Sequence, residues 1–208
     1  ADNIIISLKG KGGHGAYPQH CKDPIVAGAY LITKLQSLIS REIPPLESAV
    51  ISIGRFHAGT ASNIIPEEAV LEGTLRTLKL DIRKEIIERL EDIVEGLARS
   101  YGISATLDVI EGYPVLVNNP VLVEHISTCA KDILGSGNVH SGPPRMGAED
   151  FAYFCQKWGG VMVGIGCHDP SKGFQHDLHS PYFDFDERVL EIGARLFAHV
   201  LTRFLEKA

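Results

Sequence analysis

The residues with the clearest potential for chemistry lie in three polar, glycine-containing stretches. The first is "GKGGHGAYP", residues 10–18, in which one imidazole, His14, lies among four glycines. Glycine lets a backbone turn sharply and approach a ligand or a neighbouring subunit closely, so this stretch could present an imidazole to a substrate. A solvated histidine in a hairpin or loop turn is the alternative that the spacing leaves open.

The second stretch is "HAGTASNIIPEE", residues 57–68, which connects two predicted strands. Asn63 could bind a carbonyl or a carboxylate through its side-chain amide, although asparagine is also common in turns. Arg76 follows on the exposed face of the second strand, and its fork-shaped guanidinium suits a carboxylate ligand. Taken alone, the residue type favours an ordinary surface arginine.

The third stretch combines "MGAEDFAYF" with "CHDPSKGFQHDLHSPYFDFDE" and is rich in imidazoles and carboxylates. Both groups are ligands for zinc, manganese or cobalt. The spacing singles out no closed set of three or four ligands. Glu149 and Asp150 are predicted to begin a helix, where carboxylates also serve as caps. The histidines and aspartates of the following loop are His168, Asp169, His176, Asp177 and His179.

Composition narrows the classes of function. The 208 residues are 44% hydrophobic, enough for one large domain or two small ones. The net charge is -6, from 20 basic and 26 acidic residues without a basic run, so we expect no nucleic-acid partner. No apolar run approaches the roughly 20 residues that span a bilayer, so we expect no membrane partner. Four widely spaced cysteines predict free thiols in a reducing compartment and a cytoplasmic location: Cys21, Cys129, Cys155 and Cys167.

The first half of the chain predicts the elements that would position these residues. Strands are predicted over residues 3–10, 48–56, 68–77 and 104–111. One helix begins at Asp23 and Pro24, and a second covers residues 81–101 and ends at Gly102. The order strand, helix, strand, strand, helix, strand predicts a ferredoxin-like α+β sandwich. The predicted inward positions of the first helix are Ile25, Ala29, Ile32, Leu35 and Ile39.

Helices predominate from about residue 113. They are predicted from Asn119 to Gly135, over residues 148–158 and over residues 186–205. The apolar run at residues 160–166 predicts a strand buried on both faces. One strand cannot make a sheet, so its partners are expected elsewhere, most simply upstream of residue 1. The predicted inward positions of the last helix are Val189, Gly193, Leu196, Val200 and Phe204.

Taken in order, five stretches resemble the co-catalytic metallopeptidase and aminoacylase family. They are "GKGGHGAYP", "DPIVAGAYLITKLQSLISRE", "GTASNIIPEEAVLEGTLRT", "MGAEDFAYF" and "LHSPYFDFDE". The family includes carboxypeptidase G, hippurate hydrolase, N-acyl-amino-acid amidohydrolases and auxin-conjugate hydrolases. The resemblance implies an α/β protein, with a ferredoxin-like lid and dimerisation domain over residues 1–112. Residues 113–208 would be the C-terminal part of an α/β metallohydrolase catalytic domain. Because the chain opens inside a strand pattern, we expect a fragment that lacks the N-terminal half of that domain.

The resemblance also implies roles for individual residues. His179 matches a metal ligand, and His14 matches the lid histidine that enters the partner subunit's site and polarises the scissile carbonyl. Asn63 and Arg76 match residues that bind the substrate's carbonyl and carboxylate, and Glu149 matches a position that lines the metal site. No role follows for three other histidines, His57, His168 and His176.

The function implied by the resemblance is metal-dependent hydrolysis of the amide bond in N-acyl amino acids or small peptides. Two divalent metal ions per site (zinc, manganese, cobalt or nickel) and a homodimer formed through the lid are implied with it. The chain alone is expected to be inactive. The alternative is a non-catalytic dimerisation or small-ligand-binding module in which His14 is an ordinary turn residue. The coding sequence upstream would distinguish the two.

Overall fold

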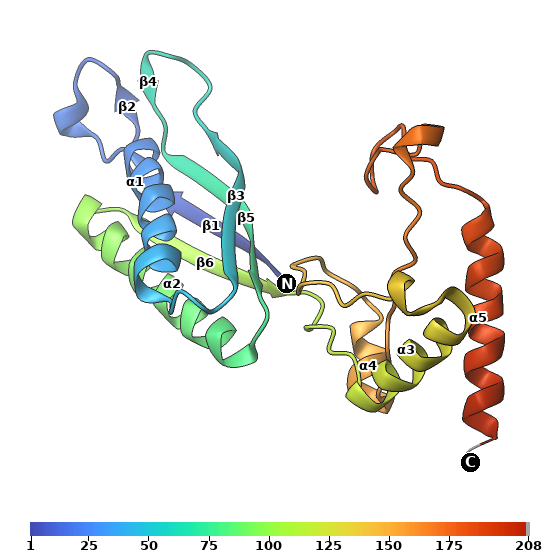
Figure 1. Ribbon diagram of the computed structural model, residues 1–208. Coiled ribbons are helices and arrows are strands. Elements are labelled where there is room, and N and C mark those ends of the chain that lie inside the picture. The colour runs from blue at the N-terminus through green and yellow to red at the C-terminus, as the bar shows by residue number, and fades with distance from the viewer. Residues whose placement is uncertain (207–208) are drawn as a thin grey trace. The chain divides into compact units, whose positions relative to one another are not determined.

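The computed structural model describes residues 1–206 and divides into two compact units. Unit 1 contains residues 1–115 together with Arg145–Asp150. Unit 2 contains the other described residues, 116–144 and 151–206. Unit 1 is built on a sheet and unit 2 on helices, and each is described by itself (Figure 1).

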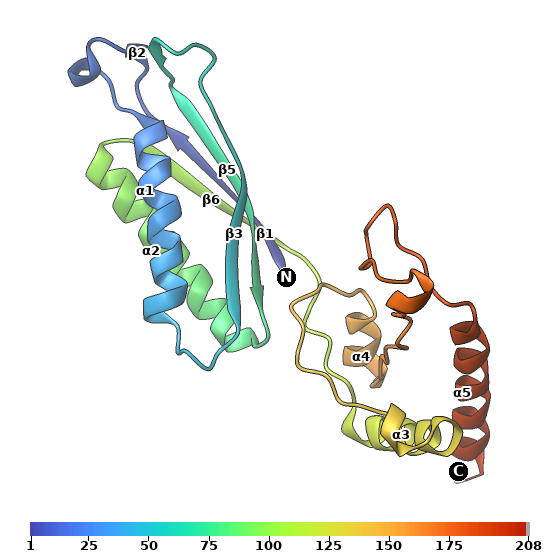
Figure 2. The ribbon, with the colours of Figure 1, turned by 45° about the horizontal axis from the view of Figure 1, so that its top comes forward.

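Unit 1 is a four-stranded antiparallel sheet covered on one face by two helices (Figures 1 and 2). The helices are α1 (Pro24–Ser37) and α2 (Leu80–Tyr101). The strand order β3-β5-β1-β6 is that of a ferredoxin-like sandwich, so the predicted fold class is confirmed. The strands are β1 (Asp2–Lys9), β3 (Ala49–Ala58), β5 (Glu68–Thr77) and β6 (Ser104–Glu111).

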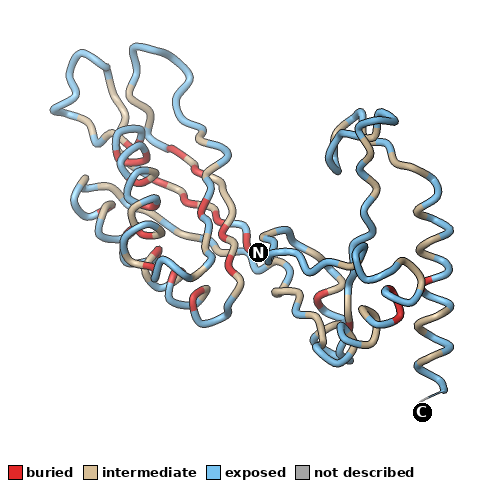
Figure 3. Tube along the Cα trace, in the orientation of Figure 1, coloured by how far each residue is buried: buried red, intermediate tan, exposed pale blue. Residues whose placement is uncertain are grey.

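The core of unit 1 lies between the sheet and the two helices, where the buried segments of Figure 3 concentrate. Alternate residues of β1 (Ile4, Ile6 and Leu8) point into this core because successive side chains of a strand face opposite ways. The apolar stripe of α2 faces the same core through buried Ile86 and Leu90.

The predicted inward face of α1 is confirmed in part. Leu35 is buried and Ile32 and Ile39 pack partly buried against the core, whereas Ile25 (39% exposed) and Ala29 face outward. The buried positions are instead Pro24, Ala27, Gly28, Leu31 and Leu35. The reason is that α1 is apolar around most of its circumference, so periodicity alone does not identify the face that packs on the sheet.

The predicted ends of the helices in unit 1 are explained by local hydrogen bonds. The Asp23 carboxylate accepts hydrogen bonds from the backbone N–H groups of Ile25 and Val26, at 2.8 and 3.4 Å. Gly102 ends α2 in the left-handed conformation, with φ of 61°. After Ser37 the chain makes a π-helical turn, η2 (Leu38–Glu42), before β3.

Unit 2 contains three α-helices and two 3-10 turns in its described part. The helices are α3 (Pro120–Leu134), α4 (Ala152–Trp158) and α5 (Arg188–Leu205). The turns are η3 (Ser136–Asn138) and η4 (Pro170–Lys172). Its small core forms where α3 meets α5, around Cys129, Ala130 and Leu196. Of the predicted inward positions of α5, Leu196 is buried and Phe204 is 51% exposed.

Two predicted elements of unit 2 differ in the structure. The helix predicted from residue 148 begins only at Ala152. No strand forms over residues 160–166 in the described chain. Instead the backbone N–H of Met162 donates to Asn118 Oδ1 at 2.9 Å, and the Asn118 amide donates to the Met162 carbonyl at 3.1 Å. A strand requires a neighbouring strand for its backbone groups, and a side chain provides the partner here.

None of the helices described between residues 1 and 206 has the length and apolar character needed to cross a bilayer.

Candidate functional site

His14 and Asn63 are brought together by a short two-stranded ribbon. Its strands are β2 (Gly13–His14) and β4 (Ile64–Ile65), with His14 paired to Ile64. The ribbon continues through a hydrogen bond from the Gly15 N–H to the Asn63 carbonyl, at 2.8 Å. Figures 1 and 2 both show β2 and β4 side by side. Two of the five predicted site residues therefore lie on neighbouring segments.

The ring of His14 is held by its own turn. The Tyr17 N–H donates to the His14 carbonyl at 2.9 Å, and the Ala16 N–H donates to His14 Nδ1 at 3.1 Å. The Tyr17 ring meets the imidazole edge to face, with centroids 5.6 Å apart. His14 is otherwise exposed. The arrangement displays an oriented imidazole on the surface of unit 1.

The glycines around His14 have a cause within their own chain. A Cβ atom at Gly10 would lie 2.1 Å from the Lys22 carbonyl oxygen, and one at Gly12 would lie 2.7 Å from the Ile65 carbonyl oxygen. Real Cβ atoms do not approach backbone this closely. The sequence suggested that these glycines allow a ligand or a partner subunit to approach closely. In the structure, the nearby backbone of Lys22 and Ile65 already requires glycine at positions 10 and 12.

Arg76 lies near the far end of β5 and is not an isolated surface side chain. Its half-buried guanidinium donates from Nη1 to the Met146 carbonyl at 2.8 Å. Met146 belongs to the segment Arg145–Asp150, which packs in unit 1 and carries Glu149. The structure therefore groups Arg76 with the segment of Glu149, and its role as a carboxylate binder stays a prediction.

Asn63 and Arg76 lie toward opposite ends of the sheet. Asn63 precedes the first residue of β5, Glu68, and Arg76 is its penultimate residue. The eight steps of β5 from Glu68 to Arg76 cover about 27 Å. An N-acyl amino acid is about as long as two extended residues, about 7 Å. The strand between the two candidate residues is therefore several times longer than a single small substrate.

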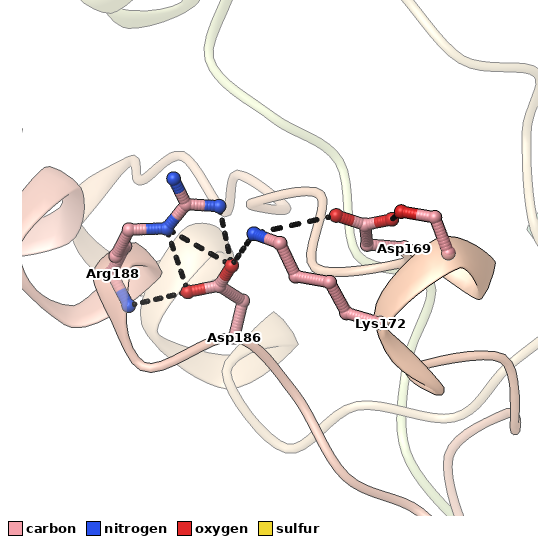
Figure 4. Close-up of polar contacts among 5 residues, drawn as sticks. Asp169, Lys172, Asp186 and Arg188 are labelled. Carbon is pink, nitrogen blue, oxygen red and sulfur yellow. Dashed lines mark hydrogen bonds and ion pairs between the residues drawn. The ribbon is translucent and has the colours of Figure 1, made fainter.

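His179 lies in the loop between η4 and α5, whose two ends are joined by an ion network (Figure 4). Lys172 in η4 donates from Nζ to Asp186 Oδ2 at 2.8 Å. Arg188, at the start of α5, binds both oxygens of the same carboxylate. Hydrogen bonds from Arg188 and then Lys172 hold the pKa of Asp186 well below its ordinary value of 3.8. Asp186 therefore stays ionised and fastens the loop.

His179 itself has a φ of 71°, the one positive value found for a residue other than glycine in the described chain. Such backbone conformations are uncommon for non-glycine residues, and histidine is among those enriched there. An unusual backbone conformation at a histidine that could bind a ligand favours a functional role.

The described residues do not by themselves fit a metal ion. Between residues 1 and 206, no three or more His, Cys, Asp or Glu side chains come together in a way that could hold one. Stable zinc sites use at least three protein ligands. His179 could contribute at most one of these ligands.

The comparisons with known proteins agree with the fold. Residues 2–102 match the family described as "Peptidase dimerisation domain". Residues 2–102 are therefore a dimerisation domain of the M20 family. A dinuclear metal-binding M20 peptidase from Bacillus subtilis superposes with a TM-score of 0.77 at 31% identity, covering 100% of this chain and 50% of that one.

Full-length relatives include hydrolases from plants and bacteria. The chain is 36% identical over 202 residues to "IAA-amino acid hydrolase ILR1-like 4" of Arabidopsis thaliana, covering 95% of this chain and 46% of that protein. It is 36% identical over 189 residues to "N-acetyldiaminopimelate deacetylase" of Streptococcus uberis, covering 90% of this chain and 49% of that protein. The chain thus spans about half the length of the relatives it matches.

Sequence reasoning missed three contributors to these sites. Tyr17 packs against His14, the Met146 carbonyl accepts from Arg76, and Asp186 anchors the loop of His179. Tyr17 and Asp186 lie within the quoted motifs, close in sequence to His14 and His179. That closeness could have indicated that they contact the candidate residues. A backbone carbonyl seventy positions from Arg76 leaves no such signal in a single sequence.

Proposed function

We propose that this M20 chain supplies the lid and the C-terminal portion of the catalytic domain in a metal-dependent amidohydrolase. Residues 1–112 form the lid and dimerisation domain, and residues 113–208 belong to the catalytic domain. The reaction is hydrolysis of the amide bond in an N-acyl amino acid or small peptide. The plant and streptococcal relatives, named as an amino-acid conjugate hydrolase and a deacetylase, support this reaction class.

The observation that carries the proposal is the grouping of the candidate residues. His14 and Asn63 share one ribbon before the start of β5, whereas Arg76 lies about 27 Å along β5 from its first residue, Glu68. If all three act on one small substrate, they must come from two copies of the chain. His14 and Asn63 then act in the partner's site, while Arg76 acts in its own.

Each side chain has a definite chemical task in this proposal. His14 and Asn63 donate hydrogen bonds to the scissile carbonyl, and these bonds strengthen as negative charge develops on its oxygen. The Arg76 guanidinium binds the free carboxylate of the substrate. Glu149, on the segment beside Arg76, lines the same site. His179 is the metal ligand that this chain contributes to a site for two divalent ions, zinc, manganese, cobalt or nickel, with the other ligands outside residues 1–206.

A homodimer has a suitable surface on unit 1. The outward face of α1 leaves Ile25, Val26 and Tyr30 exposed by 39%, 42% and 60%. A helix that is apolar on both its inward and outward faces is usually covered on both. A twofold dimer that covers this face would place two identical sites symmetrically. Each subunit could then contribute its His14 and Asn63 to the site of the other subunit.

Subunit mixing tests the proposal in the complete protein that contains this chain. Hydrolysis of a panel of N-acetyl amino acids is measured for His14→Ala, Asn63→Ala and Arg76→Ala, each expected to lose about a hundredfold or more in kcat or kcat/KM. Inactive His14→Ala and Arg76→Ala proteins are then mixed and allowed to exchange subunits. Each mixed dimer has one intact site, so about a quarter of the wild-type rate should return.

The matched control is a mixture of His14→Ala with Asn63→Ala, which leaves no intact site and should stay inactive. Recovery in the control, or no recovery in the first mixture despite confirmed exchange, would refute the shared site. Metal content should fall in His179→Ala and stay unchanged in His14→Ala. Absence of any amide hydrolysis by the complete wild-type protein would instead favour the non-catalytic module.

A further inference from the structure

The hydrogen bond to His14 Nδ1 determines where the imidazole carries its proton. The donor is the backbone N–H of Ala16, 3.1 Å away. A backbone N–H can only donate, so Nδ1 must present its lone pair to it. In a neutral imidazole the single ring proton then sits on Nε2.

Three contacts keep the ring in this orientation. The Tyr17 N–H donates to the His14 carbonyl at 2.9 Å, which closes the turn and brings the Ala16 N–H to Nδ1 of the ring. The Tyr17 side chain packs against the imidazole at 5.6 Å, with an interplanar angle of 65°. The Gly15 N–H ties the turn to the Asn63 carbonyl at 2.8 Å. Within residues 1–206, Nε2 has no hydrogen-bond partner, and the side chain is exposed.

We propose that the Ala16 amide and the Tyr17 ring are positioning groups that fix the tautomer of His14, with Nδ1 as acceptor and Nε2–H as the free donor. This inference rests on the proposed function and defines the chemistry of its lid histidine. The free Nε2–H suits an acceptor such as a carbonyl oxygen or the oxyanion formed from it. The same arrangement excludes His14 as a metal ligand, because its one lone pair faces the Ala16 N–H. It likewise excludes His14 as a general base.

The first test is the tautomer of His14 in the ¹⁵N-labelled chain, read from the ring nitrogen shifts by NMR at pH 8. His20 is the internal control, because its exposed ring has no hydrogen-bond partner in the described chain. His14 should show one tautomer, with Nδ1 unprotonated, whereas His20 should show the averaged shifts of two. Equal tautomer ratios at the two histidines would overturn the inference.

The second test is solvent exchange of the Ala16 amide in His14→Phe. Phenylalanine keeps an aromatic ring against Tyr17 but removes the acceptor. The Ala16 amide should exchange about fivefold faster, the effect expected for one lost hydrogen bond. The Tyr17 amide, bonded to the residue 14 carbonyl, should not change and reports an intact turn. An unchanged Ala16 rate with an intact turn would contradict the assignment.

Neither test involves substrate. The tautomer assignment can therefore fail while the amidohydrolase proposal stands, and it can hold in a protein that hydrolyses no amide.

Discussion

Replacing Gly10 by alanine tests whether packing within unit 1 fixes the stretch that carries His14. The new Cβ would lie 2.1 Å from the Lys22 carbonyl oxygen, 3.1 Å from the Lys22 carbonyl carbon and 3.2 Å from Pro24 Cδ. The carbonyl must therefore move by about 1 Å to reach an ordinary contact. Because it belongs to the backbone that leads into α1, no side-chain rotation can relieve the clash.

The magnitude follows from the bonds that this movement breaks. Lys11 and Lys22 exchange two backbone hydrogen bonds, each 2.9 Å long. Each is worth about 0.5–1.5 kcal/mol. Alanine is less flexible than glycine, which lowers the conformational entropy of the unfolded chain and offsets about 0.4–1 kcal/mol of this loss. We expect the free energy of unfolding of unit 1 to fall by about 2 kcal/mol, including some disturbance of the Asp23 cap.

The matched control is Gly96→Ala on the exposed face of α2, where a Cβ meets nothing within 4 Å. There alanine should stabilise by about 1 kcal/mol, because glycine is a poor helix former. Thermal unfolding followed by far-ultraviolet circular dichroism should show a midpoint lower by about 8 °C for Gly10→Ala and higher by about 4 °C for Gly96→Ala. Trp158, the single tryptophan, lies in unit 2 and reports by fluorescence whether the change stays in unit 1. A Gly10→Ala midpoint at or above that of the wild type would refute the reasoning.

Three further changes probe other parts of the chain. Asp2→Ala should lower the free energy of unfolding by about 3 kcal/mol in urea, because it strips a two-point ion pair from the largely buried Arg83 guanidinium. Leu90→Ala should cost about 3–5 kcal/mol in the same assay, because Leu90 is fully buried in the core of unit 1. The pKa of Asp186 is lowered in the folded chain, so its contribution is complete above pH 4 and declines as the pH falls toward the folded-state pKa. Backbone amides of the His179 loop should therefore lose protection in acid, whereas Asp186→Asn should show that loss already at pH 7.

Unit 1 could be predicted closely because its sequence signals are local and agree with one another. The strand over residues 68–77 and the strand over residues 104–111 have the predicted bounds, and Gly102 ends α2 as expected. Alternation in the strands and a polar outer face on α2 leave one way to bury the apolar surface. Helix α1 lacks such a polar face, and there the predicted buried side is wrong at Ile25 and Ala29.

Unit 2 was predicted less well because its apolar segments do not find partners within the described chain. The run at residues 160–166 has the composition of a buried strand, yet Met162 and Ile165 remain 47% and 39% exposed. The apolar composition indicates that the segment is suited to burial in a sheet. The strand itself forms only when a neighbouring strand supplies its backbone hydrogen bonds. That those neighbours lie upstream of residue 1 stays a prediction.

The positions of the site residues also depend on strand pairing that the sequence alone does not show. Residue types and the family resemblance selected His14, Asn63 and Arg76, but neither reveals their separation. That separation follows from pairing, because β2 and β4 bring Asn63 beside His14 while β5 carries Arg76 to the other end of the sheet.

The length of β5 connects dimerisation to catalysis in this proposal. A lid that served only to join two subunits could place its polar residues anywhere. A lid that presents an oriented imidazole before the start of β5 and an arginine near the end of that long strand suits two sites that each draw on both copies. Loss of the dimer should then remove the carbonyl-binding pair from every site while leaving each carboxylate-binding arginine in place. Dissociation would lower kcat through the lost transition-state contacts. Binding of the free amino-acid product, held through its carboxylate, would persist, which distinguishes a shared site from a lid that is only structural.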